Sequence, residues 1–379
     1  MFTKGRDVKM KFDGAAVYTF APIELPVDFW DSTGGPFHYC NMTHLVELYE
    51  AGGVTGTMIC TERMAKVVLP YIMTGETKTA GEWLDIVYWQ NRNNGFNSES
   101  AYEYGRFEFL IYDILAKMEG QPLHRYLGAK KDWLNAYGSG AGTNLTDEQM
   151  VKEIEGFLAD GYKTVKMKIA ASFGSDLDND IRRIALVRKS IGDDIGLAID
   201  ANQYFKAEEA LEFIKRANEY RIEWFEEPVH CCDFEGAAWL AERSPVDVAM
   251  GESMRNHYMF KEYLKCGVKH FQPCPSNMAG IREWMMIRDM AQDNGITLTS
   301  GGLPYMASVL ISTADETARQ EYLAPVENVQ REFLSVKWEI KDGKFYLPDI
   351  AGMPFVVDLD YMRKKGLILR KDYYYPKQL

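Results

Sequence analysis

The feature that most constrains the fold of this chain is a regular alternation that begins near residue 134. Short apolar runs recur from there to about residue 325, and each leads into an amphipathic stretch with helical spacing. The expected strands are 134–138, 164–169, 196–200, 222–226, 246–251, 269–273, 296–300 and 322–325. Strands that alternate with helices in this way predict an α/β fold with a closed parallel barrel. An open, doubly wound sheet is the alternative, and the lack of a GxGxxG motif after the first run disfavours it.

The two ends of the chain lack this alternation. Residues 15–60 mix aromatic residues, prolines and glycines, whereas apolar residues at helical spacing predict a helix over 100–118. After about residue 335 the pattern becomes one of strands and turns with a polar tail. The 379 residues are enough for two or three domains, or for one large barrel with an addition.

Composition disfavours several classes of protein. The formal net charge is −12, and no cluster of basic residues stands out beyond short pairs such as Lys130-Lys131 and Lys364-Lys365, so nucleic acid is not an expected partner. The six cysteines are scattered without CxxC spacing, which favours a reducing cytoplasm over a disulfide framework. The N-terminal residues are polar and charged, and no apolar run approaches the ~18 residues of a membrane span. We therefore expect a cytoplasmic protein without a signal peptide or membrane contact.

Three acidic residues stand at the ends of three consecutive expected strands. Asp200, Glu226 and Glu252 are separated by 26 residues in each step, which is about one strand–helix unit of a barrel. Carboxylates that converge at one side of a barrel mouth repel one another, and a divalent cation relieves that repulsion. Ligation by oxygen alone suits Mg²⁺. Each residue alone also fits a solvated loop charge or a helix N-cap, but three in step favour a metal site.

Two lysines share one face of the second expected strand. Lys166 and Lys168 are two residues apart, so their side chains point the same way while Met167 points the other way. Neighbouring ammonium groups lower each other's pKa, which brings a lysine toward the range of a general base. The alternative is a charge pair on an exposed edge strand, and an interior barrel strand disfavours it.

These motifs resemble those of the enolase superfamily, in the mandelate racemase and muconate lactonizing enzyme branch. The matching barrel motifs are Lys166-Met167-Lys168, Asp200-Ala201-Asn202, Phe225-Glu226-Glu227-Pro228 and Gly251-Glu252. The first part of the chain resembles the branch's capping domain at Gly52-Gly53-Val54-Thr55-Gly56, Gln121-Pro122-Leu123 and Leu127-Gly128. The resemblance covers nearly the whole chain.

The resemblance implies a two-domain architecture. It predicts a (β/α)7β TIM-like barrel over 133–334, and an α+β capping domain built from 1–132 and completed by 335–379. It also implies that the cap supplies the loops that determine substrate specificity. We expect the chain to form a homo-oligomer.

The resemblance also implies roles for individual residues. Asp200, Glu226 and Glu252 are implied as ligands of one Mg²⁺, with Glu227 beside them. Lys168 is implied as the general base, while Lys166 lowers its pKa and contacts the substrate carboxylate.

Further residues are expected to contact the substrate. Asn202 belongs to the strand-three motif, and Glu321 matches a family acid near strand eight by a single letter. His38 and Tyr39 lie where the cap should place a specificity loop, so either is a candidate acid toward the leaving group.

The sequence departs from the family pattern on strands six and seven. Cys274 stands where members often carry Asp or Lys, and we include it among the expected substrate contacts. Gly301 falls at the position of a catalytic histidine. A thiol without a basic neighbour has no obvious route to activation, so only the lysine face offers a base.

We therefore expect a Mg²⁺-dependent lyase that abstracts the proton α to a carboxylate. The expected reaction is dehydration of a sugar acid, an aldonate or aldarate, to a 2-keto-3-deoxy acid in carbohydrate-acid catabolism. One base suffices for this β-elimination, whereas racemisation commonly needs bases on both faces of the ene-diolate. The alternatives are a racemase or epimerase of a hydroxy or amino acid derivative, and a degenerate barrel that binds an acid without turnover.

Overall fold

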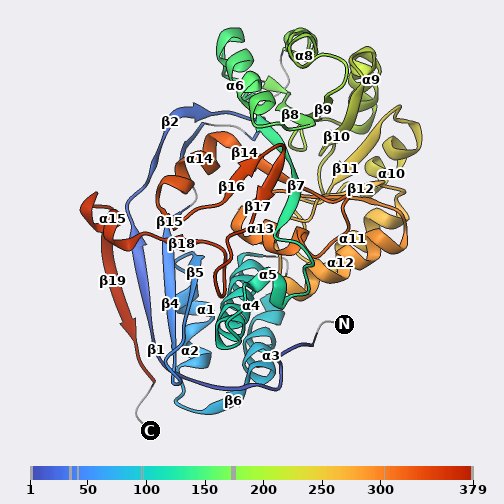
Figure 1. Ribbon diagram of the computed structural model, residues 1–379. Coiled ribbons are helices and arrows are strands. Elements are labelled where there is room, and N and C mark those ends of the chain that lie inside the picture. Colours follow the sequence, from blue (N-terminus) through green and yellow to red (C-terminus); the bar gives the residue numbers. More distant parts are fainter. Residues whose placement is uncertain are drawn as a thin grey trace.

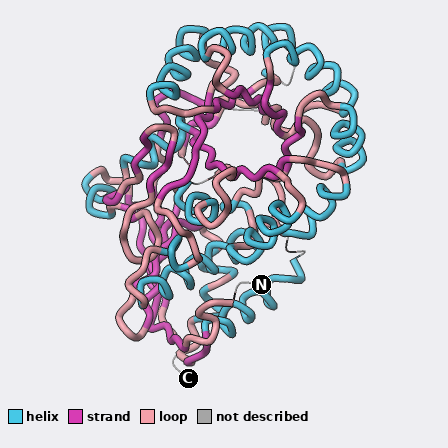
Figure 2. Tube along the Cα trace, turned by 45° about the vertical axis from the view of Figure 1, so that its right-hand side comes forward, coloured by secondary structure: helices cyan, strands magenta, loops and turns pink. Residues whose placement is uncertain are grey.

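The computed structural model describes residues 3–33, 36–40, 42–94, 96, 98–171, 176–302 and 304–376. Within these residues, eight parallel strands form a closed barrel, because the last strand pairs with the first. The strands are β7 (Trp133–Gly140), β8 (Thr164–Lys168), β9 (Gly196–Asp200), β10 (Ile222–Glu226), β11 (Asp247–Met250), β12 (His270–Phe271), β13 (Thr297–Ser300) and β14 (Arg319–Leu323). Figure 2 shows them as a ring surrounded by helices. The predicted TIM-like barrel is confirmed.

The helices follow the strands in the expected order. They are α6 (Asp147–Ala159), α8 (Leu177–Ile191), α9 (Ala207–Ala217), α10 (Phe234–Arg243), α11 (His257–Lys265), α12 (Ile281–Asp293), α13 (Pro304–Ile311) and α14 (Ala324–Glu332), with the 3-10 turns η2 (Asn218–Tyr220) and η3 (Pro275–Asn277). The Thr146 side chain accepts a hydrogen bond from the Gln149 amide, and this capping box starts α6. Helix α6 therefore begins where local capping and the apolar face of the sequence agree.

The last barrel strand begins earlier than expected. The prediction placed a strand at 322–325, whereas β14 covers Arg319–Leu323 and α14 begins at Ala324. The polar start of β14 hides it from an apolar pattern, because Arg319 contacts Glu223 Oε1 at 2.8 Å and donates to Thr164 Oγ1 at 2.8 Å. These polar groups of β14, β10 and β8 satisfy one another, so the strand needs no continuous apolar run.

The cap is built around an antiparallel sheet that joins the two ends of the chain (Figure 1). Its order is β19 (Ile368–Tyr374), β1 (Lys9–Phe20), β4 (His44–Glu50) and β5 (Thr55–Cys60), with β6 (Thr77–Thr79) on β1. Its helical elements are α1 (Met64–Val67), α2 (Leu69–Ile72), α3 (Ala80–Asn91), η1 (Arg92–Asn94), α4 (Glu99–Met118), α5 (Leu123–Tyr126) and α15 (Leu359–Lys364). The helix predicted over 100–118 is therefore confirmed as α4.

The C-terminal segment serves both parts of the molecule. Strand β19 completes the cap sheet, and β15 (Leu334–Val336) pairs with β18 (Val356–Val357). The hairpin of β16 (Glu339–Lys341) and β17 (Lys344–Tyr346) instead extends the barrel sheet antiparallel to β7. The domain limits 133–334 and 1–132 with 335–379 stay a prediction.

A hairpin of the cap reaches the C-terminal ends of the barrel strands. It consists of β2 (Glu24–Phe29) and β3 (Phe37–Tyr39), and β2 lies against α14. The Ser32 hydroxyl that follows β2 donates to the Ala201 carbonyl at 2.6 Å, and the Thr143 amide donates to the Trp30 carbonyl at 2.9 Å. The segment after β2 is therefore fixed over the end of the barrel where catalytic groups gather.

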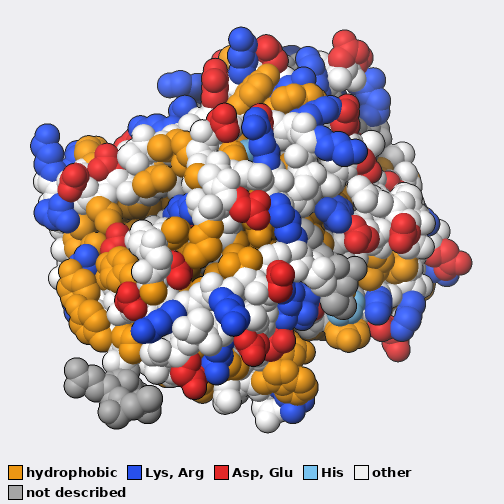
Figure 3. Space-filling view, turned by 60° about the horizontal axis from the view of Figure 1, so that its bottom comes forward, with side chains coloured by type: hydrophobic (Ala, Val, Ile, Leu, Met, Phe, Trp, Pro, Cys, Tyr) orange, Lys and Arg blue, Asp and Glu red, His pale blue; other side chains and the backbone are white. Residues whose placement is uncertain are grey.

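The charge distribution on the surface and the character of the helices are those that the composition led us to expect. Basic and acidic side chains are interspersed over the face shown in Figure 3. Among the described helices, none combines the length and apolar character that crossing a bilayer requires.

Candidate active site

The predicted carboxylates stand side by side because the strands are in register. Lys168 pairs with Asp200 across β8 and β9, and Asp200 pairs with Glu226 across β9 and β10. Asp200 and Glu226 end their strands, and Glu252 follows the end of β11. Each of the three acids offers one oxygen within 4.8 Å of the others. The structure thus brings together the three residues that the spacing predicted.

The chain turns sharply where two of these strands end. Asn202 and Glu227 have φ angles of +42° and +37°, which are left-handed conformations that non-glycine residues rarely adopt. The backbone N–H of Asn202 donates to Asp200 Oδ1 at 2.9 Å and stabilises that turn. Backbone strain of this kind costs of order 1 kcal/mol and is typical of functional sites. Here it positions carboxylates at the barrel mouth.

The lysine pair lies among the carboxylates. Lys166 Nζ is 2.5 Å from Glu226 Oε1 and 2.7 Å from Glu321 Oε1. Lys168 Nζ is 2.5 Å from Asp200 Oδ2 and donates to Asn202 Oδ1 at 3.1 Å. Both lysines are buried, so neither is an exposed edge-strand charge. The structure therefore excludes the edge-strand alternative for this pair.

The pKa of Lys168 is raised in this arrangement of side chains. Burial lowers its pKa, but the Asp200 carboxylate outweighs burial, and the Lys166 ammonium acts in the lowering direction as the sequence predicted. The negative charge of the carboxylates therefore decides the direction. A cation that offsets this charge would leave burial and Lys166 as the dominant effects.

The carboxylates also disturb one another. Burial and the Asp200 charge raise the pKa of Glu226 to about 8, although Lys166 opposes them. Burial alone would raise the pKa of Asp200, but the two lysines hold it at about 2. The buried Glu227 Oε1 has no hydrogen-bond partner among the described residues. A hard divalent cation prefers oxygen ligands, and these crowded carboxylates, with an unpaired oxygen nearby, can supply them.

Several supporting residues were missed by the sequence analysis. Glu226 Oε2 accepts hydrogen bonds from Gln272 Nε2 at 2.6 Å and from Trp224 Nε1 at 3.2 Å. Gln203 Nε2 donates to Glu227 Oε2 at 3.0 Å and to Ser253 Oγ at 2.9 Å. Gln272 follows strand β12, so the strand-end rule that found the carboxylates also applied to it.

A cavity of ≈ 190 Å³ opens beside the carboxylates. Its walls include five of the predicted site residues, Lys168, Asn202, Glu252, Cys274 and Glu321. The cap contributes Tyr39 and three further residues, and α14 contributes the opposite wall. The cavity thus lies between the barrel mouth, the β2–β3 hairpin and α14.

His38 lies away from this cavity. Phe37 and Tyr39 line it, and because side chains alternate along a strand, His38 between them points to the other face. Its Nδ1 is 2.8 Å from Asp28 Oδ1, and both side chains are exposed. The expectation that His38 contacts the substrate is therefore not supported, and Tyr39 is the residue of this pair that the structure places at the cavity.

The structure shows the surroundings of the two positions that depart from the family pattern. Burial and the Glu252 charge raise the pKa of the Cys274 thiol to about 12, and its Sγ lies 3.1 Å from Ser276 Oγ. A Cβ on Gly301 would lie 2.4 Å from Glu321 Oε2, so the Glu321 carboxylate uses the space that a side chain there would need. Neither position supplies a base.

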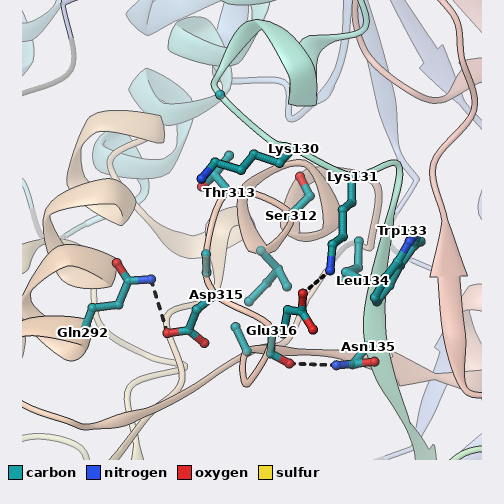
Figure 4. Close-up of a pocket in the computed structure, with 14 residues that line it drawn as sticks. Lys130, Lys131, Trp133, Leu134, Asn135, Gln292, Ser312, Thr313, Asp315 and Glu316 are labelled. Atoms are coloured by element: carbon teal, nitrogen blue, oxygen red, sulfur yellow. Dashed lines mark hydrogen bonds and ion pairs between the residues drawn. The ribbon is translucent and has the colours of Figure 1, made fainter.

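A second cavity lies at the opposite end of the barrel, where β7 begins, and Figure 4 shows the residues that line it. It measures ≈ 390 Å³ and is lined by the start of β7 and the loop between α13 and β14. Its charged groups largely satisfy one another, since Lys131 pairs with Glu316 and Gln292 Nε2 donates to Asp315 Oδ2 at 3.4 Å. Catalytic groups of barrels lie at the other end of the strands, so the smaller cavity is the candidate active site despite its size.

Comparison with known proteins agrees with this geometry. The family described as "Enolase C-terminal domain-like" matches residues 149–361. L-talarate/galactarate dehydratase of Salmonella typhimurium is 26% identical over 287 residues, which are 72% of this chain and 69% of that one. Arabinonate dehydratase of Saccharolobus solfataricus is 28% identical over 254 residues, which are 65% of this chain and 67% of that one.

Solved structures share the fold over almost the whole chain. The crystal structure of the Salmonella typhimurium L-talarate/galactarate dehydratase has a TM-score of 0.83 at 19% identity and covers 100% of this chain and 97% of its own. A racemase from Streptomyces coelicolor with bound magnesium has a TM-score of 0.81 at 20% identity and covers 92% of this chain and 98% of its own. Together with the matched family, this shows that the chain belongs to the enolase superfamily, in the mandelate racemase and muconate lactonizing enzyme branch.

Proposed function

We propose that this enzyme is a Mg²⁺-dependent dehydratase that converts a sugar acid, an aldonate or an aldarate, to a 2-keto-3-deoxy acid. The observation that carries the proposal is a pair of buried lysines, Lys166 and Lys168, beside a cluster of three carboxylates. The dehydratases among the relatives support the substrate class, since they act on talarate or galactarate, arabinonate and gluconate.

Different residues would bind the metal, contact the substrate carboxylate and transfer the proton. Asp200, Glu226 and Glu252 would hold the Mg²⁺. Bound there, the ion supplies positive charge that offsets these acids and stabilises the negative charge that develops on the substrate carboxylate. Lys166, which contacts two acids at the same mouth, contacts the substrate carboxylate.

Lys168 is the proposed general base. Its neutral Nζ takes the α-proton, and the electron pair of the broken C–H bond moves onto the carboxylate to give an ene-diolate. Collapse of the ene-diolate breaks the bond to the β-hydroxyl group, which leaves as water after accepting a proton. Lys168, once protonated, donates that proton in a syn elimination, and Tyr39 at the cap wall is the alternative donor. The resulting enol tautomerises to the keto acid.

Epimerisation is the second candidate, and the site disfavours it. Exchange of a proton on the opposite face in both directions needs a second acid–base group. Gly301 has no side chain, and the partner of the Cys274 thiol is the Ser276 hydroxyl at 3.1 Å, which is not a base that could activate it. The binding-only alternative is disfavoured by the intact lysine and carboxylate sets.

The test is a panel of aldonates and aldarates incubated with the protein and Mg²⁺ in heavy water, with products identified by NMR. We expect a 2-keto-3-deoxy acid, and none after chelation of the metal. An inverted hydroxy acid deuterated at its α-carbon, with no keto acid, would establish the epimerase instead. Binding of an acid without any chemical change would instead support the alternative of a barrel that binds an acid without turnover.

A further inference from the structure

Helix α14 forms one wall of the active-site cavity. Glu327 and Gln330, three residues apart on one face of that helix, line this α14 wall. Their side chains are only 3% and 2% exposed. Glu327 Oε2, Gln330 Oε1 and Gln330 Nε2 have no hydrogen-bond partner among the described residues. Buried polar atoms are rarely left unpaired, so these atoms point to a polar group of a ligand.

The charges around the cavity limit what that group can be. Besides Glu327, its walls carry three acidic side chains, Asp31, Glu252 and Glu321, and Glu321 is paired with Lys166 at 2.7 Å. Lys168 is the only cation among the described residues that line it, and it is bound to Asp200 at the metal-site end. At the α14 wall itself, the described lining residues offer no cation. A second carboxylate placed there would lose its hydration without a compensating positive charge, which is unfavourable.

The groups at the α14 wall suit neutral hydroxyls. Burial, reinforced by the Glu321 charge, raises the pKa of Glu327 well above its usual value, which favours the protonated carboxyl group, a hydrogen-bond donor. The Gln330 amide both donates and accepts. A hydroxyl group also donates and accepts, so a polyhydroxy chain end satisfies both residues.

We infer that Glu327 and Gln330 form a subsite for the hydroxyl groups at the substrate end farthest from the reacting carboxylate, so that the enzyme selects aldonates over aldarates. This inference rests on the proposed function and narrows its substrate class. No role is required of either residue in the proton transfer itself, so both are specificity residues.

The test compares an aldonate and an aldarate of one configuration, which differ only in a terminal CH₂OH or carboxylate. We expect the wild type to show a kcat/KM at least about tenfold higher for the aldonate, because an analogue that leaves buried polar groups unpaired is strongly rejected. Gln330→Met should raise KM for the aldonate more than it lowers kcat. Gln330→Arg should shift the preference toward the aldarate, which a simple loss of folding cannot do. Glu332→Gln, an exposed change on the same helix, is the matched control and should leave both values unchanged.

The outcomes separate the inference from the proposed function. Equal or better turnover of the aldarate would overturn the inference while the dehydratase stands. Absence of keto acid from every substrate would instead refute the dehydratase. In that case, the subsite is still tested by calorimetric titration of the Mg²⁺-loaded Lys168→Ala variant, which compares the affinities for the same two acids. Equal or tighter binding of the aldarate would overturn the subsite.

Discussion

At the scale of single residues, the site is an alternation of buried charges. Lys166 lies between Glu226 and Glu321, while Lys168 lies against Asp200. Buried ions of one sign are tolerated only when partners of the other sign or a metal compensate them. The three ligand acids exceed what the two lysines neutralise, since Glu321 also shares Lys166. We therefore expect a divalent cation to neutralise the remaining negative charge of the three ligand acids.

Replacing Glu226 by Gln tests the metal site directly. The change keeps the shape and removes the charge, so we expect the affinity for Mg²⁺ alone to fall at least ~10-fold, since even residues that only support a ligand cost 10–100-fold when lost. Titration calorimetry with Mg²⁺ measures this. Glu223→Gln, at the opposite end of β10, is the control. Unchanged Mg²⁺ affinity in Glu226→Gln would contradict the assignment.

Glu108 in α4 makes a prediction about stability and pH. Burial raises its pKa to about 7, and its Oε2 accepts from the Arg282 amide at 3.2 Å. The folded state therefore holds a proton that the unfolded state has released, so the free energy of unfolding falls as pH rises from about 4.5 to 7. With ~1.4 kcal/mol for each pKa unit, the loss is on the order of 3 kcal/mol.

Glu108→Gln removes this titration. We expect the variant to become more stable relative to wild type as pH rises through that window, with a constant difference above it. Urea unfolding at a series of pH values measures the difference, and Glu119→Gln, an exposed change at the end of the same helix, is the control. A stability difference that does not change with pH would refute the role of Glu108.

At the scale of elements, strand ends could be predicted and helix faces could not. The carboxylates and lysines were found because parallel strands place their ends at one rim, whatever the loops between them do. The position of Glu327 and Gln330 at the cavity could not be predicted, because two polar residues three apart occur on any amphipathic helix. His38 was misplaced because the register of a three-residue strand leaves no pattern in the sequence.

Helix α4 docks on the barrel through a close contact that needs glycine. A Cβ on Gly105 would lie 2.3 Å from the Met278 carbonyl oxygen and 2.8 Å from the Gly280 nitrogen, so backbone would have to move. Overpacking of this kind costs ~1–3 kcal/mol, which exceeds the ~1 kcal/mol that alanine gains in a helix. We therefore expect Gly105→Ala to lower the midpoint of thermal unfolding.

Gly156 in α6 provides the opposite case for comparison. It is exposed, and a Cβ there would meet nothing within 4 Å. Gly156→Ala should therefore stabilise the protein by up to ~1 kcal/mol through helix propensity alone. If both substitutions changed the unfolding midpoint in the same direction, close packing at Gly105 would not be the cause.

At the scale of the whole molecule, the cap and the barrel share the site. The barrel supplies the acids and lysines, and the cap closes one wall with the β2–β3 hairpin. The sequence predicted this division through family resemblance, but the pairing of β19 with β1 and of β17 with β7 depends on contacts between distant segments. Homo-oligomeric assembly and a cytoplasmic location stay predictions.

The central claim is that Lys168 removes the α-proton of a metal-held acid, and exchange of that proton with heavy water tests it most directly. NMR would follow deuterium entering the α-carbon of the best substrate in wild type and in Lys168→Ala, with Lys163→Ala at the other end of the strand as the control. General bases contribute 10²–10⁴-fold, so we expect exchange to fall at least ~10²-fold in Lys168→Ala, although the variant still binds Mg²⁺. Exchange at a near wild-type rate in that variant would contradict the account.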